Sequence, residues 1–316
     1  MTDEGQLKGE GDKYLVDGIR NGDTAAFAQL VERFSGRLTA YAVRRTSGTG
    51  IDAEDAVQET FLGFLQNVEK GPERLLQVRS LEAYLFQILR NKIYDMAGRR
   101  PEAHGLHRIP LASQDENGVA EGYEPIATSA SPSSYARNAE DLQSSTQVLG
   151  DILDEVIRRL KDERSFRDLK ILELLFLTSL KNRDIAGIVG TSEPTVTRTK
   201  QEALERLGRA AARHPLGRKG FVLPETDENA SDFIRGVWRK NLLSCLKRST
   251  LGAYALGALE EEWKDYVAFH LDRVGCEFCA ANLDDLQASG KGSTPRARER
   301  IFASSIGFLR RLGERK

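Results

Sequence analysis

Apolar side chains recur at three- and four-residue steps along most of the chain, a spacing that predicts amphipathic helices. Three such runs begin at Phe27, Val57 and Leu81 and are separated by polar or Gly-Pro breaks. No run of alternating, β-branched residues competes with them. Residues 14–100 therefore predict an all-helical domain.

The pattern changes over residues 101–144, which hold four of the nine prolines and many Ser, Gly, Asn and Glu residues. This composition predicts a flexible linker. Because a loop of that length is unusual inside one compact domain, it separates two. Helical periodicity resumes over residues 145–215, and residues 230–316 predict a further small helical unit. The predicted fold class is all-α.

Charge and cysteine content narrow the class of protein. The 46 basic and 47 acidic residues give a net charge of −1, which argues against a histone-like coat but permits a locally basic surface. Three cysteines cannot form the framework of a disulfide-rich secreted protein. The N-terminus lacks the apolar core of a signal peptide, and no stretch approaches about 18 uninterrupted apolar residues. We expect a cytoplasmic protein without a membrane partner.

The segment after Leu180 predicts a helix-turn-helix. A short helix ends at Gly190, a residue suited to a left-handed terminus, and Pro194 stands at an allowed position in the first turn of the next helix. In such motifs the N-terminal end of the second helix enters the DNA major groove. The candidate DNA contacts at that end are Thr195, Thr197, Arg198 and Lys200. The alternative is an ordinary helical hairpin with a solvated basic face.

A second stretch, DAEDAVQETFLGFLQ, concentrates acidic residues on one predicted helix, with no Lys or Arg before Lys70. Acidic residues at a helix N-terminus favour the helix dipole, which is the simplest interpretation. Glu59, however, lies beyond the first turn. An acidic surface there suits a basic protein partner.

Taken in order, GDTAAFAQLVERF, DAEDAVQETFLGFL, LEAYLFQILRNKIYDMAGRR and the helix-turn-helix resemble a bacterial extracytoplasmic-function sigma factor. The resemblance covers residues 14–100, as region 2, and 145–215, as region 4. It implies a protein that binds core RNA polymerase and directs promoter recognition, DNA melting and transcription initiation. One departure is Asp184, where the family commonly has Glu.

The resemblance also implies roles for individual residues. The loop Gly71–Ser80 would receive an extruded base of the −10 element, and the helix-turn-helix would read the −35 element. The residues implied to bind polymerase are Asp55, Gln58, Glu59 and Phe61. Those implied to contact the melted strand are Tyr84, Asn91, Lys92, Tyr94, Arg99 and Arg100. Cationic and aromatic side chains are what unpaired DNA requires, although either tyrosine could instead be a core residue.

The C-terminal extension contains a candidate metal site, Cys245, His270, Cys276 and Cys279. Three thiols and one imidazole form a complete tetrahedral zinc set, and C-x₂-C is a common half-site. The pattern resembles zinc-binding anti-sigma domains, in which the His usually precedes the first Cys by four residues; here the separation is six and includes Gly275. The alternatives are packed or surface cysteines, or a redox disulfide between Cys276 and Cys279.

The extension is expected to contact the sigma domains within the same chain and to regulate them. No P-loop, serine elbow or H-E-x₂-H motif occurs, so we expect no enzymatic activity. Two other functions remain open: a conventional helix-turn-helix regulator that acts without polymerase, and a zinc or thiol sensor.

Overall fold

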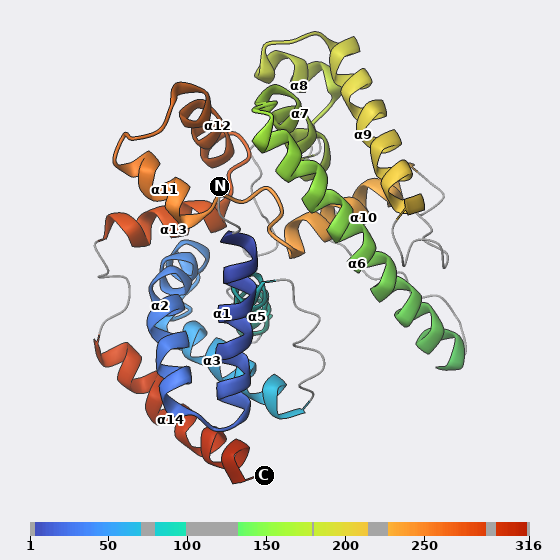
Figure 1. The fold of residues 1–316 in the computed structure, drawn as a ribbon. Coiled ribbons are helices and arrows are strands. Elements are labelled where there is room, and N and C mark those ends of the chain that lie inside the picture. The colour runs from blue at the N-terminus through green and yellow to red at the C-terminus, as the bar shows by residue number, and fades with distance from the viewer. Residues whose placement is uncertain are drawn as a thin grey trace. The chain divides into compact units, whose positions relative to one another are not determined.

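The computed structural model describes residues 4–70, 80–98, 132–178, 180–213, 227–288 and 295–314. Throughout these ranges the secondary structure is helical, as the periodicity predicted, and the chain divides into two compact units (Figure 1). The predicted loop Gly71–Ser80 lies outside the described residues except for its last residue, and so do Arg99 and Arg100.

The first unit combines the N-terminal helices with three helices from the far end of the chain. Its members are α1 (Glu4–Arg20), α2 (Thr24–Thr46), α3 (Ala53–Lys70), α5 (Leu81–Gly98), α11 (Arg248–Ala255), α13 (Glu277–Gln287) and α14 (Pro295–Glu314). The second unit contains α6 (Pro132–Asp162), α7 (Phe166–Leu177), α8 (Asn182–Val189), α9 (Glu193–Arg213), α10 (Asp227–Lys240) and α12 (Glu261–Asp272).

Two boundaries differ from the sequence prediction. Residues 230–316, expected as one further unit, are shared between both units, because α10 and α12 pack on the second and α11, α13 and α14 on the first. Helix α6 begins at Pro132, inside the predicted linker 101–144. Proline is tolerated in the first helical turn, where its missing N–H would have no intrahelical partner.

The core of the first unit is aromatic. Asp23 caps α2 by accepting hydrogen bonds from the backbone N–H groups of residues 25 and 26, and the apolar face then begins at Phe27. The rings of Phe27 and Phe61 meet edge to face with their centroids 6.1 Å apart. From the extension, Phe278 packs against Phe86 with a centroid distance of 4.7 Å. The C-terminal helices thus contribute to this core.

The second unit is built around α7. Phe166, its first residue, stacks on Tyr266 of α12 with a centroid distance of 4.9 Å. At the other end of α7, Arg235 and Arg239 of α10 donate to backbone carbonyls of residues 176 and 177, at 3.0 and 2.8 Å. These carbonyls have no intrahelical partner at a helix C-terminus, so α10 satisfies them. Both ends of α7 depend on the extension.

Candidate functional site

The acidic surface of α3 begins at its N-terminal end. Asp52 accepts hydrogen bonds from the backbone N–H groups of Glu54 and Asp55, at 2.7 and 3.2 Å, and therefore acts as the helix cap. The side chains of Glu54 and Asp55 are part-exposed, and Glu59 is exposed about one turn later. Asp52 thus caps the helix. The other acidic side chains, those of Glu54, Asp55 and Glu59, are at least partly accessible.

Glu59 forms an ion pair with Lys92, a residue predicted to contact DNA. Its carboxylate lies 3.1 Å from the Nζ atom of Lys92 on α5. Glu59 and Lys92 are both partly exposed, and the pair joins the predicted polymerase-binding surface to the predicted single-strand-binding surface.

Phe61 has a different place from the one that the resemblance implied. Its side chain is fully buried against Phe27 in the core of the first unit, whereas Gln58 is half-buried at the edge of the acidic surface. A side chain with no exposed area cannot touch a partner directly. We correct its role to that of a core residue that supports α3.

The predicted single-strand contacts on α5 differ in exposure. Tyr94 is 59% exposed, and Asn91 is also exposed. Tyr84 is half-buried: its hydroxyl accepts a hydrogen bond from the amide of Asn67 at 2.8 Å, and its ring packs edge-on to Phe64. Tyr94 is therefore better placed to stack with a base, and Tyr84 contributes to the packing between α3 and α5.

Helices α8 and α9 meet at the turn around Gly190. Gly190 ends α8 in the left-handed conformation, with φ 72° and ψ 42°, and Val196 is fully buried near the start of α9. Asp184 lies in the first turn of α8, where an acidic residue favours the helix dipole. Near the beginning of α9, Thr197 and Arg198 are exposed.

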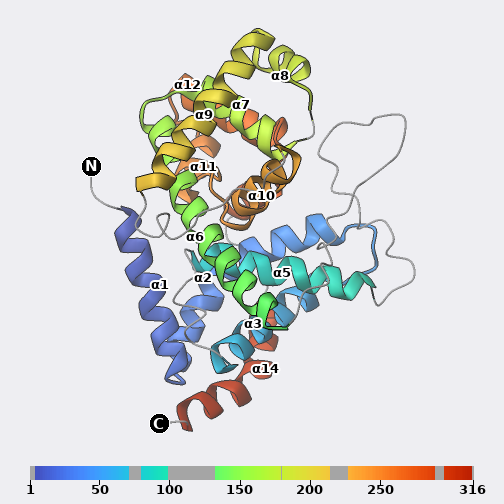
Figure 2. The same ribbon diagram turned by 90° about the vertical axis from the view of Figure 1, so that its right-hand side faces the viewer.

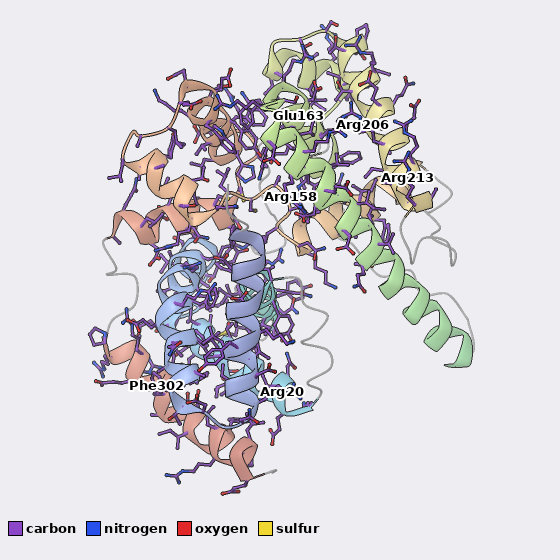
Figure 3. All side chains as sticks on the ribbon, in the orientation of Figure 1. Arg20, Arg158, Glu163, Arg206, Arg213 and Phe302 are labelled. Carbon is purple, nitrogen blue, oxygen red and sulfur yellow. The ribbon has the colours of Figure 1, made fainter. Side chains whose placement is uncertain are left out.

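Two of the predicted DNA contacts on α9, Thr197 and Arg198, interact with residues of α8 and α9. The Thr197 hydroxyl donates to the backbone carbonyl of Glu193 at 3.2 Å and accepts from Asn182. Arg198 is exposed and lies 3.7 Å from Glu202, one turn along the same helix. Thr195 and Lys200 are half-buried. Further along α9, Arg206 and Arg213 extend the basic character of the helix (Figure 3).

The four predicted metal ligands come together. Among the described residues, Cys245, His270, Cys276 and Cys279 form a cluster in which the candidate ligand atoms all lie within 4.8 Å of one another. His270 and Cys279 are buried, and Cys245 and Cys276 are half-buried. The Sγ atoms of Cys245 and Cys276 are 3.6 Å apart.

Gly275 accounts for the longer His-to-Cys spacing. Helix α12 ends at Asp272, and Gly275 then adopts a left-handed φ of 64°. This turn brings the backbone N–H of Cys276 within 3.3 Å of the His270 carbonyl. The two additional residues between His270 and Cys276 therefore form a turn. This turn reverses the chain and brings Cys276 back to His270.

Glu173 is a residue that the sequence reasoning missed. It lies on α7, is fully buried, and accepts hydrogen bonds from His270 Nδ1 at 2.7 Å and from the Tyr266 hydroxyl at 3.1 Å. Its position in the otherwise apolar run ILELLFL is the only signal that could have drawn attention to it. A buried carboxylate bonded to one ring nitrogen orients a histidine for ligation through the other.

The donor set fits zinc. Zn–S bonds of about 2.3 Å in a tetrahedron place sulfurs about 3.8 Å apart, close to the Cys245–Cys276 separation. The carboxylate–histidine arrangement is that of many zinc sites. The cluster could therefore bind a metal ion such as Zn²⁺.

A protein-family model matches part of the chain. Residues 30–101, which include most of α2 and all of α3 and α5, match the model of sigma-70 region 2. This match supports a sigma-70 family factor. Such factors are non-enzymatic, and they act in transcription initiation with core RNA polymerase and promoter DNA. No solved structure matches the chain.

Among the helices that the structure describes, none has both the length and the apolar character needed to cross a bilayer.

Proposed function

We propose that the chain is a sigma factor of the extracytoplasmic-function type, which binds core RNA polymerase in the cytoplasm and directs it to promoters. The observation that carries the proposal is the region 2 match over α2, α3 and α5, combined with the acidic residues that α3 exposes. A conventional helix-turn-helix regulator needs no such helix.

Binding to polymerase is assigned to α3. The carboxylates of Asp55 and Glu59 are accessible and suit a basic protein surface. Gln58 lies between them in the sequence. Phe61 acts indirectly, because its burial against Phe27 holds α3 in place.

Contact with the melted strand is assigned to α5. An exposed aromatic ring can stack with an unpaired base, and neighbouring cations hold the backbone. Tyr94 is the exposed ring, and Asn91 and Lys92 are the polar residues beside it. The −10 element would be read by this surface together with the loop Gly71–Ser80.

Recognition of the −35 element is assigned to the beginning of α9. Thr195, Thr197, Arg198 and Lys200 offer hydroxyl and cationic donors for base edges and phosphates. In this proposal α8 and α9 act as a helix-turn-helix, with the first helix supporting the second.

The cysteine–histidine cluster would hold Zn²⁺ in this chain through Cys245, His270, Cys276 and Cys279. When bound, the ion would supply a structural cross-link between segments distant in the sequence. Glu173 would fix the orientation of the His270 ring through its hydrogen bond to Nδ1. The extension would thereby regulate the sigma domains, with its own stability coupled to metal or thiol state.

The direct test is run-off transcription with purified core polymerase, comparing the wild type with the variant Asp55→Lys/Glu59→Lys. We expect the wild type to direct promoter-specific transcripts and the variant to lose both transcripts and core binding, because two charges facing a basic partner are reversed. A matched control is Glu155→Lys/Glu261→Lys, which reverses two exposed charges in the second unit. Equal core affinity for all three proteins would refute the assignment of α3.

The DNA-binding half is tested separately with Arg198→Ala. If Arg198 reads a base, affinity for the upstream element falls by about 1–3 kcal/mol. If it meets phosphate alone, the loss is uniform across sequences and the salt dependence becomes shallower. Unchanged affinity for every duplex would remove Arg198 from the interface.

A further inference from the structure

Helix α14 packs directly on α3, the helix assigned to polymerase binding. Figure 1 and Figure 2 show α14 running beside α3, and it also packs against α2. Its inner face is apolar: Ile301 and Leu309 are 2% exposed. Phe302, labelled in Figure 3, meets Phe27 edge to face with a centroid distance of 5.6 Å. The aromatic pair Phe27–Phe61 is thereby extended by a ring from α14.

The turn between α1 and α2 is shaped to receive α14. Gly22 has a φ of 76°, and a Cβ atom added there would lie 2.7 Å from the backbone nitrogen of Gly313 and 2.8 Å from the Leu309 carbonyl oxygen. Only glycine permits both this backbone conformation and this approach. The turn at Gly22 therefore leaves room for α14, and a side chain at this position would collide with the backbone of that helix.

Two arginines on α14 pair with the acidic residues of α3. Arg300 Nη2 lies 2.6 Å from Asp55 Oδ1, and Arg300 Nη1 lies 3.6 Å from Glu54 Oε2. Arg311 Nε lies 3.4 Å from Glu69 Oε1, near the other end of α3. The hydrogen bond to Asp55 is the main reason that the pKa of the Arg300 guanidinium is raised above its ordinary value.

The Arg300–Asp55 pair is half-exposed, with about 45% of the Arg300 side chain and 48% of the Asp55 side chain accessible. Exposed pairs are weak individually and are screened by salt. A partner that offers several cations can therefore replace them. Because α14 belongs to the same chain, its effective concentration at α3 is high, and the weak contacts stay occupied until a partner arrives.

We propose that α14 is an intramolecular competitor for the acidic surface of α3, and that core polymerase must displace its arginines from Asp55 and Glu54 in order to bind. This inference rests on the proposed function of α3. It specifies the regulation of that surface: the competing group is cationic and lies at the end of the same chain.

The test uses the full-length protein, because deleting residues 221–316 would remove buried residues from both units. The variant Arg300→Glu/Arg311→Glu replaces two attractive pairs with repulsive ones while leaving the buried face of α14 intact. We expect its affinity for core polymerase to rise by roughly three- to tenfold, since the competing cations are removed.

The matched control is Arg296→Glu/Arg310→Glu. These two arginines lie on the same helix and are exposed, and they have no ion pair with α3 among the described residues. The control changes the net charge equally, so we expect core affinity equal to that of the wild type or lower. An equal rise in both variants, or no rise in the first, would overturn the proposal.

The outcome separates this inference from the proposed function. If Asp55→Lys/Glu59→Lys abolishes core binding while Arg300→Glu/Arg311→Glu leaves it unchanged, α3 is the polymerase surface and α14 does not compete for it. If none of the proteins binds core polymerase, both proposals fail.

A second measurement follows α14 itself. Hydrogen–deuterium exchange of the wild-type protein reports the protection of α14 with and without core polymerase. Displacement predicts that the amides around Arg300 lose protection in the complex. Retained protection in a stable complex would show that α14 stays in place and would overturn the proposal.

Discussion

The residues after position 230 are attached to the two units of the chain through polar pairs that differ in their exposure to water. In the second unit, His270 of α12 is bonded to Glu173 of α7, and the exposed fractions of their side chains are 1% and 0%. In the first unit, Arg300 of α14 is bonded to Asp55 of α3, and nearly half of each side chain is accessible. One pair is excluded from water and the other is in contact with it.

Because the two pairs differ in exposure, we expect them to differ in how readily they break. A buried carboxylate is costly to leave without its partner, so α12 and α7 must stay together for the unit to remain folded. An exposed pair exchanges readily with water, salt or another cation. Helix α12 is thus integrated into the second unit, whereas α14 is attached to the first unit mainly through its apolar face.

The largest effect is expected from Glu173→Ala. Removing the carboxylate leaves the buried donors of His270 and Tyr266 without this acceptor, which should lower the free energy of unfolding of the second unit by about 1–3 kcal/mol for each donor. Both tryptophans of the chain, Trp238 and Trp263, lie in that unit, so their fluorescence during urea unfolding reports it selectively. Glu163→Ala, which removes an exposed acid paired with Arg159, is the control and should leave the midpoint unchanged.

The apolar attachment of α14 is tested by Ile301→Ala. Because Ile301 is buried, truncation should destabilise the packing of α14 by about 2–4 kcal/mol. Hydrogen exchange of α14 amides measures the change. Ile306, which is 44% exposed on the same helix, provides the control substitution Ile306→Ala. Equal effects of the two variants would contradict the assigned inner face.

A smaller effect concerns metal affinity. Glu173→Gln keeps the shape of the side chain and removes its charge, so zinc affinity should fall by about 10–100-fold through weaker orientation of His270. Competition against a chromophoric chelator measures the dissociation constant, with Glu163→Gln as the control. Unchanged affinity would assign Glu173 to packing alone.

The smallest effect on stability is expected from Arg300→Ala. Removing an exposed pair should leave the thermal midpoint within experimental error, because the Arg300 side chain is largely solvated in either state. The effect of the substitution should instead appear in how the hydrogen-exchange protection of α14 changes with salt concentration. Between about 0.01 M and about 1 M ionic strength the Debye length falls from about 30 Å to about 3 Å, and the protection of α14 should decrease in the wild type more than in the variant. An identical salt response would show that the pair contributes nothing to docking.

Several features of this protein could be predicted from local sequence. The apolar spacing around Phe27, Val57 and Leu81 predicted α2, α3 and α5, and Gly190 marked the end of α8. The cysteine–histidine set was recognised from its residue types. Helix periodicity, caps and turns depend on neighbours within a few residues, so the sequence by itself determines them.

Other features depended on the tertiary structure. The bond between Arg300 and Asp55 joins residues 245 positions apart, and that between His270 and Glu173 spans 97. Nothing local distinguishes Arg300 from the exposed Arg310, or the buried Phe61 from an accessible aromatic residue. Burial and ion pairing depend on which distant helices pack together, and for that reason only the folded chain decided that the C-terminal extension belongs to both units.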